Sequence, residues 1–157
     1  KTANSVGAKC IVDTSGAALQ ALKGKHAFLI KPNIGELCKM LDVERLANNE
    51  VPDAAQQAGR DGFAELIAVA MGPDGAWLVT GEKKYFAAAP SVKKKSTVGA
   101  GDSMVAGITY MLQQKQHLQQ VINFGVACGS AATMNDGTQL FKLEDVNALY
   151  EQINGKK

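Results

Sequence analysis

The chain has 157 residues, 46% of them hydrophobic, and a net charge of +2 from 17 basic and 15 acidic side chains. This charge gives no general reason to expect a nucleic acid or an anionic membrane as partner. No apolar run approaches the ~20 residues of a membrane-spanning helix, so we expect a soluble, cytoplasmic protein built as one domain.

Short apolar runs alternate with amphipathic stretches, which is typical of α/β proteins. Strands are expected at 10–13, 28–30 and 66–69, with helices at 17–22, from Asn33 and from about Pro52. Two further strands, 76–80 and 85–88, flank a hairpin turn at 81–84. Helices follow from about 102 to 111, over 118–133 and over 143–153, the last with an apolar stripe at Val146, Leu149, Tyr150 and Ile153.

The three cysteines and two histidines show no pattern of metal ligands or disulfides. Cys10, Cys38 and Cys128 are far apart and set among apolar residues, which indicates buried free thiols in a reducing compartment. His26 and His117 have no clustered ligands nearby, which argues against a metal hydrolase. A dinucleotide-binding oxidoreductase is disfavoured too, because no G-x-G-x-x-G follows the first strand.

The segment Gly99-Ala100-Gly101-Asp102 carries the strongest chemical signal. Glycines let backbone amides converge on an anion at the positive start of a helix. A carboxylate at such a place can accept the proton of an attacking hydroxyl in phosphoryl transfer. Taken alone, the same four residues also fit close helix packing with an acidic first turn.

Several segments together resemble the ribokinase-like (PfkB) carbohydrate kinases, and especially the branch that acts on phosphosugars. The resemblance covers nearly the whole chain and implies a three-layer α/β sandwich: a mostly parallel sheet with an antiparallel hairpin and helices on both faces. The segments that carry it, in the family's order, are Asp13–Gly16, Lys31–Asn33 with Glu36, Gly72–Gly75, Ser96–Met104, and Gly129–Thr133 with Asn135 and Gly137.

The resemblance implies a catalytic group at the start of the helix after Gly99. Asp102 would be the base for the sugar hydroxyl, and the amides of Gly99, Ala100 and Gly101 would form the anion hole for the γ-phosphate. Ser96 would lie near a monovalent-cation site, which makes K⁺ a candidate cofactor.

The remaining implied residues would bind Mg·ATP. Lys31 would contact the phosphates, and Asn33 with Glu36 would position Mg²⁺, although the pair fits a helix cap with a first-turn acid equally well. Gly72 and Gly75 would form a turn against the nucleotide. Asn135 would contribute to the adenine-side wall.

The family also implies what this chain would transform and what it lacks. We expect an ATP-dependent kinase for fructose 6-phosphate, with 1-phosphofructokinase and tagatose 6-phosphate kinase as alternatives and a non-catalytic nucleotide-binding fragment as the alternative of another class. Residues 1–157 would be the nucleotide-binding, catalytic portion, without the N-terminal part that carries the substrate lid. A homodimer is a candidate state for the full-length protein.

Overall fold

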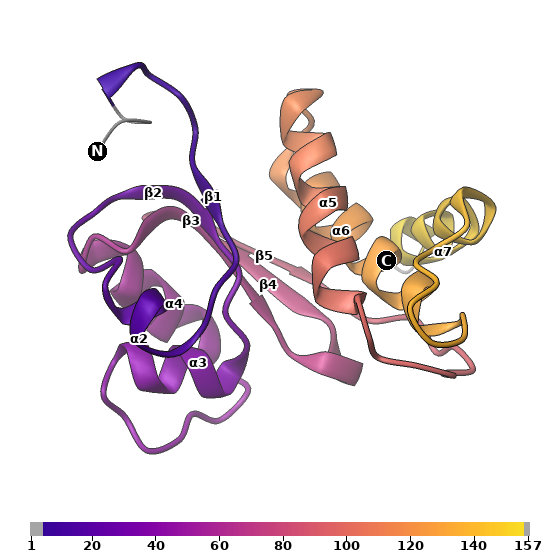
Figure 1. The fold of residues 1–157 in the computed structure, drawn as a ribbon, viewed down its shortest axis with the longest axis horizontal. Helices are drawn as coiled ribbons and strands as arrows, with labels where there is room; N and C mark the ends of the chain where they lie inside the picture. The colour runs from indigo at the N-terminus through magenta and orange to yellow at the C-terminus, as the bar shows by residue number, and fades with distance from the viewer. Residues whose placement is uncertain (1–4, 156–157) are drawn as a thin grey trace. The chain divides into compact units, whose positions relative to one another are not determined.

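The computed structural model describes residues 5–155, which form five strands, six α-helices and one short 3₁₀ turn (Figure 1). All the strands and helices expected from the sequence are present, with bounds that shift by a residue or two. The strands are β1 (Ile11–Val12), β2 (Ala27–Ile30), β3 (Ala64–Ala70), β4 (Ala76–Val79) and β5 (Lys84–Ala87). The helices are α2 (Gly16–Gln20), α3 (Ile34–Met40), α4 (Val51–Arg60), α5 (Ala100–Gln113), α6 (Leu118–Thr133) and α7 (Leu143–Gly155), and the 3₁₀ turn is Gly72–Asp74.

The strands form one sheet in the order β1-β2-β3-β4-β5. β1 and β2 are parallel, with Val12 opposite Ile30. β2 and β3 are parallel as well, with Ile30 opposite Ile67. Only short turns lead into β4 and β5, which makes those two strands antiparallel to their predecessors, because a parallel connection needs a crossover of about a dozen residues. The sheet is therefore mixed, and the α/β class with an antiparallel hairpin is confirmed.

The chain divides into two compact units that share the hairpin region. The first, which we call the strand unit, comprises the chain up to Met71 together with Trp77–Lys84. The second, the helix unit, comprises Gly72–Ala76 and the chain from Tyr85 onward. Within residues 5–155 no helix has the length and apolar composition needed to cross a bilayer.

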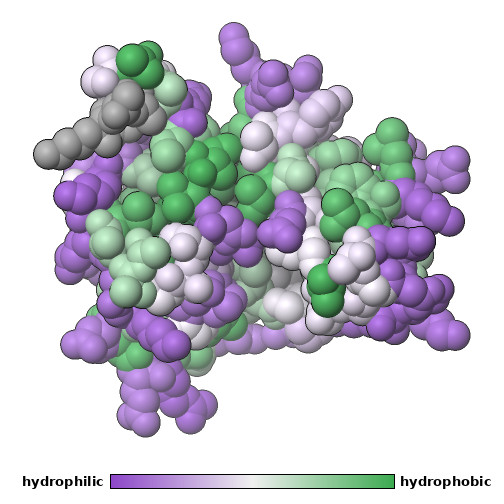
Figure 2. Space-filling view, viewed as in Figure 1, coloured by the Kyte–Doolittle hydropathy of each residue, from purple (hydrophilic) through white to green (hydrophobic). Residues whose placement is uncertain are grey.

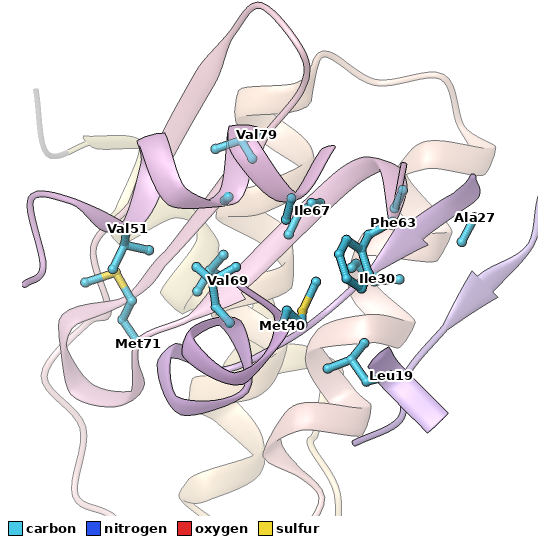
Figure 3. Packing of buried hydrophobic residues seen from close by; sticks show 14 residues of the cluster. Leu19, Ala27, Ile30, Met40, Val51, Phe63, Ile67, Val69, Met71 and Val79 are labelled. Atoms are coloured by element: carbon cyan, nitrogen blue, oxygen red, sulfur yellow. The ribbon is translucent and has the colours of Figure 1, made fainter. Parts of the chain in front are cut away.

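The core of the strand unit lies between β2, β3 and the helices α2, α3 and α4 (Figure 3). Val51, Ala55 and Ala58 repeat at helical spacing on α4 and are fully buried, as are Ile30 on β2 and Ile67 on β3 at 0% and 1% exposure. The parallel strands are almost continuously apolar, which is expected when both faces of a strand are covered. This core fixes the carboxyl ends of β1, β2 and β3.

The core of the helix unit is made by close packing of α5 on α6. A methyl group added at Gly107 would lie 2.7 Å from Sγ of Cys128, and one at Gly125 would lie 2.6 Å from Cγ1 of Ile108. Glycine is therefore required at both positions for the two helices to approach this closely.

On α7, Val146, Leu149 and Ile153 of the predicted stripe are buried, whereas Tyr150 is half-buried. The ring of Tyr150 makes an edge-on contact with that of Phe124 on α6. The stripe thus joins α7 to the rest of the helix unit.

Candidate active site

The carboxyl ends of β1 and β2 bring an acidic and a basic side chain together. Asp13 directly follows β1 and Lys31 directly follows β2, and because Val12 and Ile30 are register partners, the two residues lie side by side. Nζ of Lys31 is 3.4 Å from Oδ2 of Asp13. The Lys31 side chain is only 11% exposed, so its ammonium is held in place rather than freely solvated. Asp13 had no assigned role in the sequence-based prediction, because the pairing depends on strand register.

Asn33 and Glu36 form a reciprocal cap at the start of α3. Oδ1 of Asn33 accepts a hydrogen bond from the backbone amide of Glu36 at 2.9 Å. In return, Oε2 of Glu36 accepts one from the backbone amide of Asn33 at 2.9 Å. The structure thus shows the capping arrangement that was left open beside the magnesium role. Within residues 5–155, Oε1 of Glu36 has no hydrogen-bond donor or cation beside it, and a single carboxylate oxygen suits Mg²⁺, which keeps several waters.

The start of α5 leaves backbone donors open. Gly99 precedes the helix with φ of 75°, in the left-handed region, and no side chain caps the helix. The amide of Ala100 makes only a long contact, 3.4 Å, with the carbonyl oxygen of Thr97. Among the described residues, the amides of Gly99 and Gly101 have no hydrogen-bond acceptor. A helix start with open amides and a positive dipole end is suited to bind an anion.

Asp102 lies in the first turn of α5 and is exposed. No hydrogen bond or ion pair engages its carboxylate within the described part of the chain. A carboxylate without a partner, in the same turn as open amides, is able to accept a proton from a bound hydroxyl. The structure therefore brings together all four members of the predicted catalytic group, Gly99 to Asp102.

The side chain of Ser96 joins the loop at 88–99 to the loop at 134–142, which we call the loop pair, and the side chain of Asn135 ties the second loop to the end of α6. Oγ of Ser96 donates to the carbonyl oxygen of Gly137 at 3.1 Å. Nδ2 of Asn135 donates to the carbonyl oxygens of Ala131 at 3.1 Å and Leu140 at 2.8 Å. Both amide hydrogens of Asn135 are thus used inside the protein, and only its Oδ1 remains for a nucleotide.

Exposed apolar side chains flank this loop pair. Val98 and Leu140 are 55% and 52% exposed, and a methyl group added at Gly99 would meet Cδ2 of Leu140 at 2.8 Å. On the face drawn in Figure 2, apolar side chains in green are exposed among hydrophilic ones in purple. Leu140 is notable because its Cδ2 lies close to Gly99, the first residue of the turn with the open amides.

The two glycines of the Gly-Pro-Asp-Gly turn differ in what requires them. Gly72 has φ of 59° and open space around its α-carbon. Gly75 has φ of 116°, and a methyl group there would lie 2.0 Å from the carbonyl oxygen of Ala87 and 2.8 Å from the amide nitrogen of Ala89. The close approach of the backbone at Ala87 therefore requires glycine at position 75, whereas the open space beside Gly72 leaves room for a ligand.

Other parts of the described chain add no further catalytic cluster. Across residues 5–155 no three His, Cys, Asp or Glu side chains gather as a metal site. A shallow hollow of about 420 Å³ lies between β5, α6 and α7, and its lining includes Gln119, Asn123 and Asn154 but none of the predicted site residues. Cys38 and Cys128 are buried as predicted, whereas Cys10, which directly precedes the short strand β1, is only half-buried.

The motifs described above occur together in a known protein family. The model of the pfkB family of carbohydrate kinases matches residues 1–145. The chain belongs to this family. The predicted resemblance is thus confirmed, and the Gly-Ala-Gly-Asp turn, the Asn-x-x-Glu pair and the Gly-Pro-Asp-Gly turn all fall within the matched residues.

Similar proteins of known activity include two kinds of phosphofructokinase. The chain is 41% identical over 153 residues to the ATP-dependent 6-phosphofructokinase isozyme 2 of Escherichia coli, covering 97% of the chain and 50% of that protein. It is 34% identical over 154 residues to the 1-phosphofructokinase of Borreliella burgdorferi, covering 96% of the chain and 49% of the relative. The chain thus spans about half the length of these relatives.

Solved structures show the same relationship. Crystal structures of Escherichia coli phosphofructokinase-2, one with substrates and products and one with potassium, both give a TM-score of 0.91 at 40% and 41% identity. They cover 98% and 97% of this chain and 50% of each crystallised chain. An Arabidopsis thaliana ribokinase gives a TM-score of 0.80 at 20% identity over 94% of this chain and 49% of its own. The ribokinase-like fold predicted from the sequence is therefore confirmed.

Proposed function

We propose that this chain is the nucleotide-binding, catalytic portion of an ATP-dependent kinase that phosphorylates a hydroxyl of fructose 6-phosphate. The observation that carries the proposal is the first turn of α5, where the unpartnered Asp102 carboxylate accompanies the open amides of Gly99 and Gly101. The 41% identity to an ATP-dependent 6-phosphofructokinase across 97% of the chain supports the choice of donor and acceptor.

In the proposed reaction Asp102 accepts the proton of the sugar hydroxyl as its oxygen attacks the γ-phosphorus of ATP. A new oxygen–phosphorus bond forms, the bond from the γ-phosphorus to the bridging oxygen breaks, and ADP leaves with that bonding pair. The amides of Gly99, Ala100 and Gly101 donate to the phosphoryl oxygens, on which negative charge is spread in the transition state. These donors are fixed by the helix start before any ligand binds, so they need no reorganisation.

The residues at the strand ends serve the nucleotide phosphates. Lys31 supplies a positive charge for the phosphate oxygens, and the open Oε1 of Glu36 with Asn33 would hold Mg²⁺, which neutralises phosphate charge when bound. In the loop pair, Asn135 offers Oδ1 to the adenine side, and Gly72 leaves space for close approach of the nucleotide to the backbone.

K⁺ is proposed as a further cofactor near Ser96. Oγ of Ser96 lies 3.1 Å from the carbonyl oxygen of Gly137, and hydroxyl and carbonyl oxygens suit a hard monovalent cation. A crystal structure of Escherichia coli phosphofructokinase-2 contains potassium, which supports the proposal. We expect turnover to rise when K⁺ replaces Na⁺ at constant ionic strength, and this increase to be smaller in Ser96→Ala. An equal increase in both proteins would remove Ser96 from the cation site.

The acceptor is tested by measuring ADP release by the full-length protein from Mg·ATP with fructose 6-phosphate, fructose 1-phosphate and tagatose 6-phosphate. The similarity to a 1-phosphofructokinase at 34% identity makes fructose 1-phosphate the second candidate. We expect Asp102→Asn to lower turnover by about 10²- to 10⁴-fold, the usual contribution of a general base, while Mg·ATP binding persists. Asp145→Asn, which removes a first-turn acid from α7, is the matched control and should keep full turnover.

The alternative of another class, a nucleotide-binding module without turnover, has its own signature in the same assay. Mg·ATP would bind to the full-length protein, no sugar phosphate would stimulate ADP release, and Asp102→Asn would change nothing.

The oligomeric state of the full-length protein is tested separately by sedimentation. One structure of Escherichia coli phosphofructokinase-2 is a tetrameric inhibited form, so sedimentation must distinguish a dimer from a tetramer. We expect the full-length protein to sediment as a homodimer.

A further inference from the structure

The Asp-Thr-Ser-Gly motif has no role in the reaction described above, yet its first residue contacts Lys31. We propose that Asp13 is a positioning residue that holds the ammonium of Lys31 ready for the phosphates of the nucleotide. This inference rests on the proposed function and adds one residue to its machinery. The strands that carry the pair, β1 and β2, run side by side in Figure 1 and pair in parallel.

The geometry of the pair fits positioning rather than full neutralisation. The separation of 3.4 Å is longer than the roughly 2.7–2.9 Å of a charge-assisted hydrogen bond, so Asp13 attracts the ammonium without binding it tightly. An ammonium carries three hydrogens, and those that Asp13 does not engage are available for phosphate oxygens. Within the described residues Asp13 is the one acidic side chain that forms an ion pair with Lys31.

Burial explains why such a weak pair would matter. Fixing a freely rotating lysine side chain costs about 2 kcal/mol in rotamer entropy. Packing that fixes the stem of the side chain imposes this cost before any ligand binds. The Lys31 side chain is 11% exposed and the Asp13 side chain 33%, so the stem is fixed and the carboxylate decides where the terminal ammonium rests. Without Asp13 the ammonium would have no charge partner in a largely dehydrated place and would move towards solvent.

A second ion pair in the strand unit shows what an ordinary surface contact looks like. Nζ of Lys23 lies 3.4 Å from Oδ2 of Asp61, the same separation, but the Lys23 side chain is 61% exposed. The Asp61 side chain is 25% exposed, so the two pairs differ in the lysine, and a pair whose ammonium is solvated by water is worth little. Asp61→Asn therefore removes an ion pair of equal length without affecting a buried lysine, and serves as the matched control.

The experiment is a double-mutant cycle in the full-length protein with Asp13→Asn, Lys31→Gln and the double variant. We expect Asp13→Asn to lower kcat about tenfold, the effect of losing one interaction with a charged group, while KM for the sugar phosphate stays within about twofold. In the Lys31→Gln background the same change should lower kcat by less than about twofold, because its effect passes through Lys31. Asp61→Asn should leave kcat unchanged.

Three results would overturn the inference. Equal losses from Asp13→Asn in both backgrounds would mean that Asp13 acts directly, for example on a cation. A loss no larger than that of Asp61→Asn would mean that the contact is only a surface pair. The third is a kcat of Asp13→Glu as low as that of Asp13→Asn, because Glu keeps the carboxylate and should restore most of the activity. If Asp13→Asn folds poorly, the kcat of Asp13→Glu is compared with that of the wild-type protein instead, and a tenfold loss in Asp13→Glu would overturn the inference.

Failure of the proposed function would be visible separately. If the wild-type protein shows no acceptor-dependent ADP release, the kinase proposal fails whatever the variants do. The cycle is then read from the dissociation constant of Mg·ATP, measured by calorimetry. Non-additive losses for Asp13→Asn and Lys31→Gln would still support positioning, and additive losses would overturn it.

Discussion

Gly75→Ala tests whether the backbone of β5, rather than a nucleotide, requires glycine at the end of the Gly-Pro-Asp-Gly turn. A methyl group at Gly75 would lie 2.0 Å from the carbonyl oxygen of Ala87, 2.8 Å from the amide nitrogen of Ala89 and 2.9 Å from the α-carbon of Ala88. All three neighbours belong to the backbone, so no side-chain rotation relieves the overlap. Forced overpacking and an unfavourable positive φ each cost ~1–3 kcal/mol, which gives a loss of about 4 kcal/mol in the free energy of unfolding.

The assay is urea unfolding of the full-length protein, with Gly72→Ala as the control. Gly72 also has a positive φ, 59°, but open space around it, so its substitution should cost only ~1–2 kcal/mol. The difference of about 2–3 kcal/mol, divided by an m-value of about 3 kcal/mol/M, corresponds to a midpoint roughly 0.7–1 M urea lower for Gly75→Ala. If both variants unfold at the same urea concentration, the close approach of β5 is not what requires glycine. Gly72→Ala should instead raise KM for Mg·ATP, because its new methyl group can meet only a ligand.

Other predictions concern the helix unit. Gly107→Ala places a methyl group 2.7 Å from Sγ of Cys128 and should cost ~1–3 kcal/mol of stability in thermal unfolding; Cys128→Ala in the same chain should recover most of it, and no recovery would contradict this packing. Burial raises the pKa of the Cys128 thiol from 9.0 to about 12, so iodoacetamide at pH 8 should modify this thiol only after unfolding. The free energy of unfolding should fall as the pH rises from 9 towards 12, because the thiol ionises in the unfolded chain before it ionises in the folded one. Rapid native alkylation of Cys128 would show that the thiol is accessible. Asn123→Ala removes the 2.8 Å hydrogen bond to Oδ1 of Asn154 and the acceptor for Nε2 of Gln119, and should lower the unfolding free energy by ~1–3 kcal/mol; an unchanged Tm would contradict this.

The sequence allowed the fold to be predicted where the signal is local. Apolar runs bounded by turn residues marked β2 and β3, and the stripe on α7 was read from helical spacing, because both patterns repeat within a few residues. The proposed catalytic turn was likewise predicted from neighbouring residues, Gly99 to Asp102. Asn33 and Glu36 were also recognisable, since a capping box spans only four positions.

What could not be predicted depends on contacts between distant segments. The pairing of Asp13 with Lys31 follows from the register of β1 and β2, which the sequence does not specify. The need for Gly75 comes from Ala87, across the hairpin, and looks from the sequence like any other turn glycine. Both amide hydrogens of Asn135 are taken by carbonyl oxygens of its own surroundings, which no motif reveals.

The polar residues at the starts of α3 and α5 are expected to be conserved for different reasons. Asn33 and Glu36 each satisfy a backbone amide of the other, so a descendant selected only to fold would gain by keeping both. Asp102 makes no hydrogen bond or ion pair within residues 5–155 and gains only the modest attraction of a helix start, which other residues could supply. If a lineage lost the proposed phosphoryl transfer, Asp102 would therefore be substituted early, while the Asn-x-x-Glu pair would be kept for its contribution to folding.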